Sequence, residues 1–228
     1  MIAILSGLIA GAGHVWSGPD HLAAIAPLAV RQPARSWLPG LRWGIGHSAG
    51  VALIGVLSLM LRELLPVDLL SSWGERFVGV MLIGIGLWGV RKALQNTVHS
   101  HEHEHDGDRH AHVHVHSPKH PHAVVHRHTH AAVGIGILHG LAGSSHLLGI
   151  LPMLAFPTQT QAICYLAAFA AGTVISMAGF SWSMGLAARR AAGRGLMFYR
   201  VLMVGCGAAA TIVGCVWIAQ TLTTSPHP

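Results

Sequence analysis

Long, nearly unbroken apolar runs constrain this chain more than any other feature. They recur along most of its 228 residues, of which 52% are hydrophobic and only 10% are charged. Soluble domains carry about 25% charged residues, and a helix needs about 20 consecutive apolar residues to span the hydrocarbon of a bilayer. The runs therefore predict a membrane protein. Helices are the expected state, because an open strand leaves backbone polar groups unpaired in lipid.

Six segments have the length and composition of transmembrane helices: residues 2–28, 40–62, 70–93, 131–156, 159–187 and 197–222. The fold class that we expect is an all-α polytopic membrane protein. The N-terminal run lacks a basic region, so we interpret it as a retained first span rather than a signal peptide. Pairs of small residues predict close contacts between the helices, at Gly7/Gly11, Gly46/Gly50 and Gly136/Gly140.

The basic residues are distributed very unevenly between the two predicted sides of the membrane. Six crossings place twelve of the 14 Lys and Arg residues on one side and only Arg62 and Arg76 on the other. The positive-inside rule then predicts a multi-pass protein of the cell (inner) membrane, with residues 93–130 in the cytoplasm and both termini extracytoplasmic. The basic residues form no patch, which argues against a nucleic-acid partner.

An internal repeat with an offset of 125 residues divides the chain. HVWSGPDHLAAIAPL begins at His14 and HGLAGSSHLLGILPM begins at His139, so that His21 matches His146. Three spans in each half make the two copies inverted in the membrane, as in many secondary transporters. The predicted organisation is a first three-span repeat over residues 1–95, a loop over 96–130, a second repeat over 131–222 and a tail over 223–228.

Pro19 predicts that the first span is interrupted. A proline in the middle of a helix clashes with a carbonyl one turn earlier and removes a hydrogen-bond donor. The run Ser17-Gly18-Pro19-Asp20 is instead typical of the start of a second half-helix, with proline near its first position. Interrupted spans at corresponding positions of two halves indicate a transport site, so we expect the site here.

The candidate site residues are ionisable side chains inside the predicted spans: His14, Asp20, His21, His47, His139 and His146. Such residues are energetically costly in a membrane and are usually functional. A structural role stays open for Asp20, because a carboxylate in the first turn of a half-helix is stabilised by the helix dipole. For His47, an interhelical hydrogen bond is the alternative.

The ligand types favour nickel or cobalt. Imidazole suits zinc, copper, iron and nickel, whereas thiolate ligands favour copper(I) or zinc. The three cysteines, Cys164, Cys206 and Cys215, form no C-x-x-C motif and suggest no thiolate site. Histidines with one carboxylate fit nickel(II) or cobalt(II) without excluding zinc.

The loop between the halves is rich in histidine. Residues 99–130 contain 13 of the 19 histidines and no apolar run that could form a core, so we expect this loop to be disordered. His-rich tracts of this kind are typical of metal binding. The loop would then hold metal on the cytoplasmic face, with a solvated spacer as the alternative.

Three segments together resemble the nickel/cobalt transporter superfamily, especially its urease-accessory (UreH-type) permease branch: His14…Asp20-His21-Leu-Ala-Ala-Ile, GIGH at 44–47 and LHGLAGSSH at 138–146. The resemblance implies transport of Ni2+ or Co2+, no enzymatic reaction, no permanent cofactor, and metal roles for His14, Asp20 and His21. High-affinity nickel permeases place Asp and His five and six positions after the first His, whereas here they follow at six and seven. The urease-accessory branch favours uptake over efflux and suggests a cytoplasmic metallochaperone as a partner.

Three other classes of membrane protein share some of these features. A membrane thiol-electron carrier of related topology needs a reactive cysteine in each half, where this chain has His and Ser. A di-iron membrane oxygenase needs H-x-x-H-H clusters, which the spans lack. A metal sensor or metallochaperone in the membrane would use the same ligands as a transporter, so the sequence leaves it open.

Overall fold

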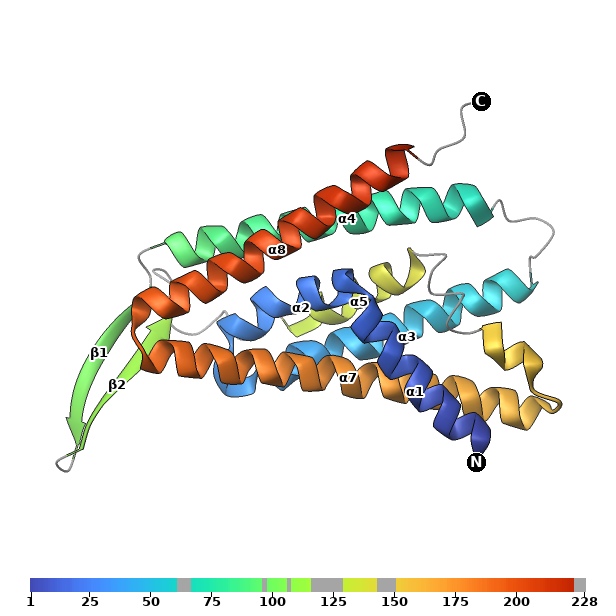
Figure 1. Ribbon diagram of the computed structural model, residues 1–228, viewed down its shortest axis with the longest axis horizontal. Coiled ribbons are helices and arrows are strands. Elements are labelled where there is room, and N and C mark those ends of the chain that lie inside the picture. Colours follow the sequence, from blue (N-terminus) through green and yellow to red (C-terminus); the bar gives the residue numbers. More distant parts are fainter. Residues whose placement is uncertain (61–66, 96–97, 106–107, 116–128, 143–150, 224–228) are drawn as a thin grey trace.

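The computed structural model describes residues 1–60, 67–95, 98–105, 108–115, 129–142 and 151–223. The described helices are α1 Ile2–Ser17, α2 Pro19–Arg31, α3 Trp37–Met60, α4 Val67–Leu94, α5 Thr129–Leu141, α7 Gln159–Gly193 and α8 Leu196–Thr223, with short 3-10 helices η1 Pro33–Arg35 and η2 Leu151–Ala155. They form an elongated bundle in which α3 and α4, and likewise α7 and α8, run in opposite directions along the long axis (Figure 1).

Several of these helices are long and apolar enough to cross a membrane. In the described part of the chain, three qualify singly, in α4, α7 and α8, and α1 with α2 qualifies as a fourth if the bent pair is one span. The sequence predicted six. Its spans 40–62 and 131–156 run into residues that the structure does not describe, so those two crossings stay predictions. The fold of the membrane part is helical, as expected.

The predicted interruption of the first span is confirmed. The chain bends by 75° between α1 and α2, Gly18 is extended at the break, and Pro19 occupies the first turn of α2. In the second copy of the repeat, α5 ends at Leu141, one residue before the position equivalent to Ser17. The residues that follow, 143–150, lie outside the described part.

α2 is the most enclosed helix of the bundle. It lies between the pair α4/α8 and the pair α3/α7 (Figure 1), and it contacts all four of them. Most of its residues from Asp20 to Val30 are buried, and Ala24 and Ile25 belong to the main apolar core with Trp43, Leu82 and Met177. The first turn of α2 therefore lies deep in the bundle.

Close helix contacts at the glycine pairs are confirmed. A Cβ atom on any of the six glycines would collide with the backbone of a neighbouring helix: α7 for Gly7 and Gly11, α5 for Gly46 and Gly50, and α3 for Gly136 and Gly140. With no side chain between them, α1 lies directly on α7 and α5 directly on α3. The α3–α5 contact brings together two helices that carry candidate histidines, His47 and His139.

The contacts between the two halves of the chain are reciprocal. Gly46 of α3 lies against Val133 of α5, and Gly172 of α7 lies against Leu8 of α1. Val133 follows Leu8 by 125 positions and Gly172 follows Gly46 by 126. Exchanging the halves therefore maps the α3–α5 contact onto the α7–α1 contact, and it maps the α4–α8 contact onto itself.

The His-rich loop was expected to be disordered, but part of it forms a hairpin. Strand β1 Val98–His105 pairs antiparallel with β2 Asp108–Val115, and the register sets His99 opposite His114 and His101 opposite His112. Histidine at every second position has the period of a β-strand, and the intervening Asp106-Gly107 is a sequence that favours tight hairpins. The expectation rested on composition and missed this period. The rest of the loop, 116–128, lies outside the described residues.

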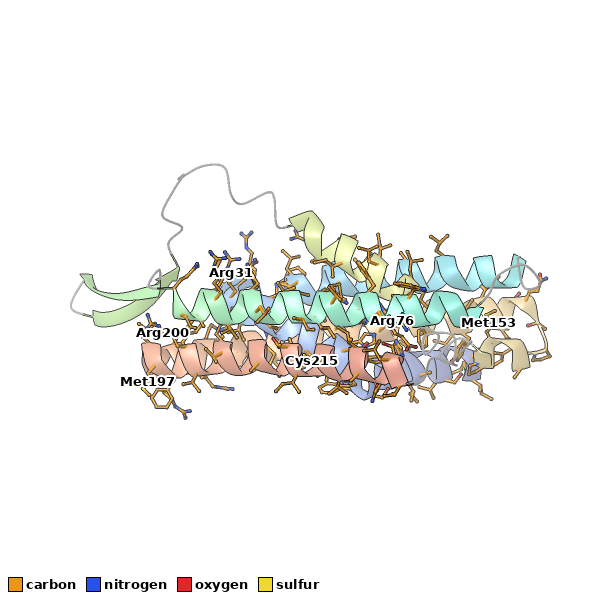
Figure 2. All side chains as sticks on the ribbon, turned by 90° about the horizontal axis from the view of Figure 1, so that it is seen from above. Arg31, Arg76, Met153, Met197, Arg200 and Cys215 are labelled. Atoms are coloured by element: carbon orange, nitrogen blue, oxygen red, sulfur yellow. The ribbon has the colours of Figure 1, made fainter. Side chains whose placement is uncertain are left out.

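The labelled arginines differ in their position along the bundle. Arg31 and Arg200 lie toward one end of the long axis and Arg76 toward the other (Figure 2). The hairpin lies at the end of Arg200, while α1 begins and α8 ends toward the opposite end (Figure 1). Which of the two ends faces the cytoplasm stays a prediction.

Candidate metal centre

The break between α1 and α2 positions three of the candidate side chains. His14 lies in the last turn of α1, and Asp20 and His21 lie in the first turn of α2. Because the chain turns by 75° at Gly18, residues on either side of the break face one another. The rings of His14 and His21 meet edge to face, with centroids 4.8 Å apart.

Two further histidines come from neighbouring helices. His47 lies in α3 and His139 in the last turn of α5. The small residues Gly136 and Gly140 allow α5 to approach the backbone of α3 at Trp43 and His47. As a result the ring centroids of His47 and His139 are 5.4 Å apart, although the residues are far apart in sequence.

Three imidazole nitrogens converge on one side of the cluster. Nε2 of His47 lies 3.4 Å from Nε2 of His14 and 3.4 Å from Nε2 of His21. The three rings form a group whose ligand atoms all lie within 4.8 Å of one another. A group of three nitrogens at this spacing can hold a transition metal ion.

The carboxylate of Asp20 occupies the other side of the cluster. Its Oδ1 lies 3.0 Å from Nδ1 of His21, and its Oδ2 lies 3.2 Å from Nε2 of His139. Asp20, His21 and His139 form a second group of possible metal ligands, again within 4.8 Å. His21 belongs to both groups.

The cluster is a group of buried polar side chains inside an otherwise apolar bundle. His47 and His139 are fully buried, and His21 and Asp20 are 2% and 5% exposed, while His14 is only partly buried. Burial of a carboxylate and several imidazoles is unfavourable unless these groups bind one another or an ion. Such a cluster is typical of a functional site in a membrane protein.

The structure brings together five of the six predicted residues. His14, Asp20, His21, His47 and His139 lie in one cluster, and His146 lies outside the described residues. Sequence reasoning did not single out the aromatic rings beside the cluster: Trp43 lies 5.8 Å from His139 and Phe169 lies 5.6 Å from His14, measured between ring centroids. Trp43 precedes His47 by four residues, and this helical spacing was the available signal.

Gly18 is required by the site itself. A Cβ atom there would collide with Nδ1 of His21 and would lie 2.8 Å from Oδ1 of Asp20. Since the φ of Gly18 is −95°, the restriction is steric and does not arise from an unusual backbone conformation. We expect Gly18→Ala to lower Ni2+ affinity by roughly tenfold or more, the scale seen when groups that orient metal ligands are disturbed.

Equilibrium Ni2+ binding to the purified full-length chain in detergent measures this effect. Gly13→Ala is the matched control, because it adds the same methyl group to α1 at a position with no described atom within 4 Å. Native affinity in Gly18→Ala would show that Gly18 does not shape the metal centre.

The long apolar helices and the buried polar cluster define a multi-pass membrane protein. A family model described as cytochrome C biogenesis protein transmembrane region matches residues 3–209. The chain belongs to this family. No solved structure gives a significant match.

Three curated relatives are similar to the chain. Chloroplast protein FOR GROWTH AND FERTILITY 1 of Arabidopsis thaliana is 35% identical over 79% of this chain and 48% of its own length. FOR GROWTH AND FERTILITY 2 of the same plant is 33% identical over 79% and 46%. The chain thus spans about half the length of these two proteins. Urease accessory protein UreH of Bacillus sp. (strain TB-90) is 27% identical over 82% of this chain and 78% of the relative.

These comparisons change the predicted family in part. The similarity to a urease accessory protein agrees with the resemblance inferred from the His and Asp motifs. The matching family model is instead that of the cytochrome c biogenesis proteins, and this match favours the alternative of a thiol-electron carrier. The comparisons therefore show the cytochrome c biogenesis family, and transport of nickel or cobalt is a proposal.

Proposed function

We propose that the protein transports a divalent transition metal ion, Ni2+ or Co2+, across the membrane. The observation that carries this proposal is the cluster of His14, Asp20, His21, His47 and His139 inside the helical bundle. The ion is the substrate, and the proposal includes no catalytic step and no permanent cofactor. The similarity to a urease accessory protein favours uptake, with a cytoplasmic metallochaperone as acceptor.

The spacing of the imidazoles supports a metal ion as the ligand. Nitrogen ligands bind at about 2.1 Å, so two ligands of a tetrahedral ion lie roughly 3.4 Å apart. The two Nε2–Nε2 distances from His47, to His14 and to His21, are both 3.4 Å. Imidazole is a suitable ligand for nickel as well as zinc, and the carboxylate of Asp20 supplies negative charge beside a divalent cation.

The arrangement of the helices supports transport rather than simple storage. α1 with α2, α3 and α4 belong to the proposed first repeat over residues 1–95, and α5, α7 and α8 to the second over 131–222. The reciprocal contacts of Gly46 and Gly172 relate the two halves, as expected for inverted repeats that rock about a central site. The basic residues favour six crossings with the hairpin in the cytoplasm and both termini outside.

Counterflow of radioactive nickel in proteoliposomes tests the proposed function directly. We expect labelled Ni2+ to enter vesicles that are preloaded with unlabelled Ni2+ or Co2+, and to do so faster than in vesicles that contain heat-inactivated protein. Binding of Ni2+ without counterflow would identify a membrane metal sensor or metallochaperone instead.

A second candidate function is electron transfer between thiols, which the family match favours. The chain has three cysteines, Cys164 in α7 and Cys206 and Cys215 in α8, all as free thiols. A full-length variant with all three replaced by serine separates the two functions. We expect it to retain Ni2+ counterflow. Loss of counterflow with intact folding and metal binding would favour the thiol chemistry.

The His-rich loop is proposed to concentrate metal on the cytoplasmic side. Its hairpin places histidine opposite histidine in β1 and β2, and the transport cluster lies on other elements. Deleting residues 99–130 is expected to lower the apparent affinity for Ni2+ several-fold while counterflow continues. Initial rates over a range of Ni2+ concentrations measure this. Complete loss of transport in a deletion that folds and inserts would contradict it.

A further inference from the structure

We propose that Asp20 and His139 are positioning residues, and that the ion is held by Nε2 of the three histidines His14, His21 and His47. This inference rests on the proposed function, because it concerns how the same site binds its metal. It assigns the carboxylate to orienting a ligand rather than to coordinating the ion. It also places the second half of the chain, through His139, in control of the ligand geometry.

The two nitrogens of His21 face different partners. Nδ1 lies 3.0 Å from Oδ1 of Asp20, and Nε2 lies 3.4 Å from Nε2 of His47. A neutral imidazole has one N–H donor and one acceptor nitrogen, and a carboxylate only accepts hydrogen bonds. Nδ1 of His21 therefore carries the proton, and Nε2 carries the lone pair. The lone pair is directed toward the three-nitrogen group, where a metal ligand is needed.

Asp20 is held in turn by the second half of the chain. Its Oδ2 lies 3.2 Å from Nε2 of His139, within the range of an ion pair, while its Oδ1 accepts the hydrogen bond from His21. A chain of contacts thus runs from α5 through His139 and Asp20 to His21. Metal-bound histidines commonly donate their second N–H to a carboxylate, which fixes the ring and makes it a stronger ligand. A movement of α5 relative to α2 would change this support and so the affinity for the ion.

The alternative is direct binding by Asp20, His21 and His139, which would use Nδ1 of His21 instead. Two observations favour the three-nitrogen group. Its Nε2–Nε2 distances of 3.4 Å are those of two ligands on one tetrahedral ion, and they are long for a hydrogen bond. His14 is also only partly buried, so this group has one ligand near the surface of the bundle, whereas Asp20, His21 and His139 are all buried.

The number of bound imidazoles distinguishes the two arrangements. Co2+ is the probe, because each imidazole that binds it through Nε2 gives one strongly shifted, exchangeable N–H signal in the proton NMR spectrum. The chain is used at full length, with the histidines of 99–130 replaced by serine so that the loop binds no cobalt. On this background we expect three such signals, with that of His21 exchanging slowest because its N–H donates a hydrogen bond to Asp20.

Three variants on this background complete the test. Asp20→Asn keeps an acceptor for His21, and His139→Gln removes only the support of Asp20, so both should keep three signals while Co2+ affinity falls about 10- to 100-fold. His47→Gln should leave two signals. The inference would be overturned if the parent protein gave only two signals, or if His139→Gln lost one signal. The absence of saturable Co2+ binding to the parent protein would also overturn it. Three signals in a protein that shows no counterflow would instead refute transport and leave the inference standing.

Discussion

Replacing His21 by alanine is expected to abolish Ni2+ counterflow. His21 is the one residue that belongs to both groups of candidate ligands, and its ring contacts Asp20 and His47 on opposite edges. Its removal deletes a ligand and also leaves the buried carboxylate without one of its hydrogen bonds. Loss of a residue that only supports a ligand lowers metal affinity about 10- to 100-fold. Loss of His21 should exceed that range.

The measurement is the initial rate of Ni2+ counterflow in proteoliposomes, normalised to inserted protein. Ser183→Ala, an exposed position on α7, is the control for the effect of a mutation as such. We expect His21→Ala to elute from a sizing column like the parent protein, since the buried ring belongs to the polar cluster and not to the main apolar core. Counterflow at a near-native rate in His21→Ala would refute the proposed site.

Gly172→Val is expected to disrupt the bundle rather than the chemistry of the site. A Cβ atom on Gly172 would collide with the carbonyl group of Leu8, and a backbone atom cannot rotate away as a side chain can. Overpacking of a core typically lowers stability by about 1–3 kcal/mol and sometimes more, and the upper end applies where backbone must move. The equivalent Gly46→Val, against Val133, should have an effect of similar size.

Thermal denaturation of the purified protein in detergent measures this effect. The loss of the monodisperse peak on a sizing column reports the fraction that has denatured at each temperature. Gly179→Val is the matched control, because it makes the same change in α7 at a position with no described atom within 4 Å. We expect the control to denature near the parent temperature. Equal loss of stability in Gly172→Val and Gly179→Val would mean that helix propensity, and not the α1–α7 contact, sets the result.

The helical membrane fold was readable from local patterns. Apolar runs predicted the helices that the structure places at α4, α7 and α8, and Pro19 predicted the break between α1 and α2. Both features are set by residues that are close together in the sequence. In lipid, the backbone N–H and C=O groups of a span must form hydrogen bonds within their own helix, and a proline disrupts the middle of a regular helix. The hairpin β1–β2 follows from the two-residue period of its histidines, a signal that the overall composition of the loop does not contain.

The sequence alone predicted that ionisable residues lie inside apolar, membrane-spanning segments. It identified His14, Asp20 and His21 as one segment and connected them to His139 through the repeat, because duplicated motifs are visible without any structure. The tertiary structure alone decided which atoms meet. Whether His47 joins the cluster, and which nitrogen of His21 faces Asp20, depend on how closely α3, α5 and α2 approach. Glycine pairs in the sequence predict that α3 and α5 make close contacts, but which helices they meet, and at what distance, depends on the packing of the whole bundle.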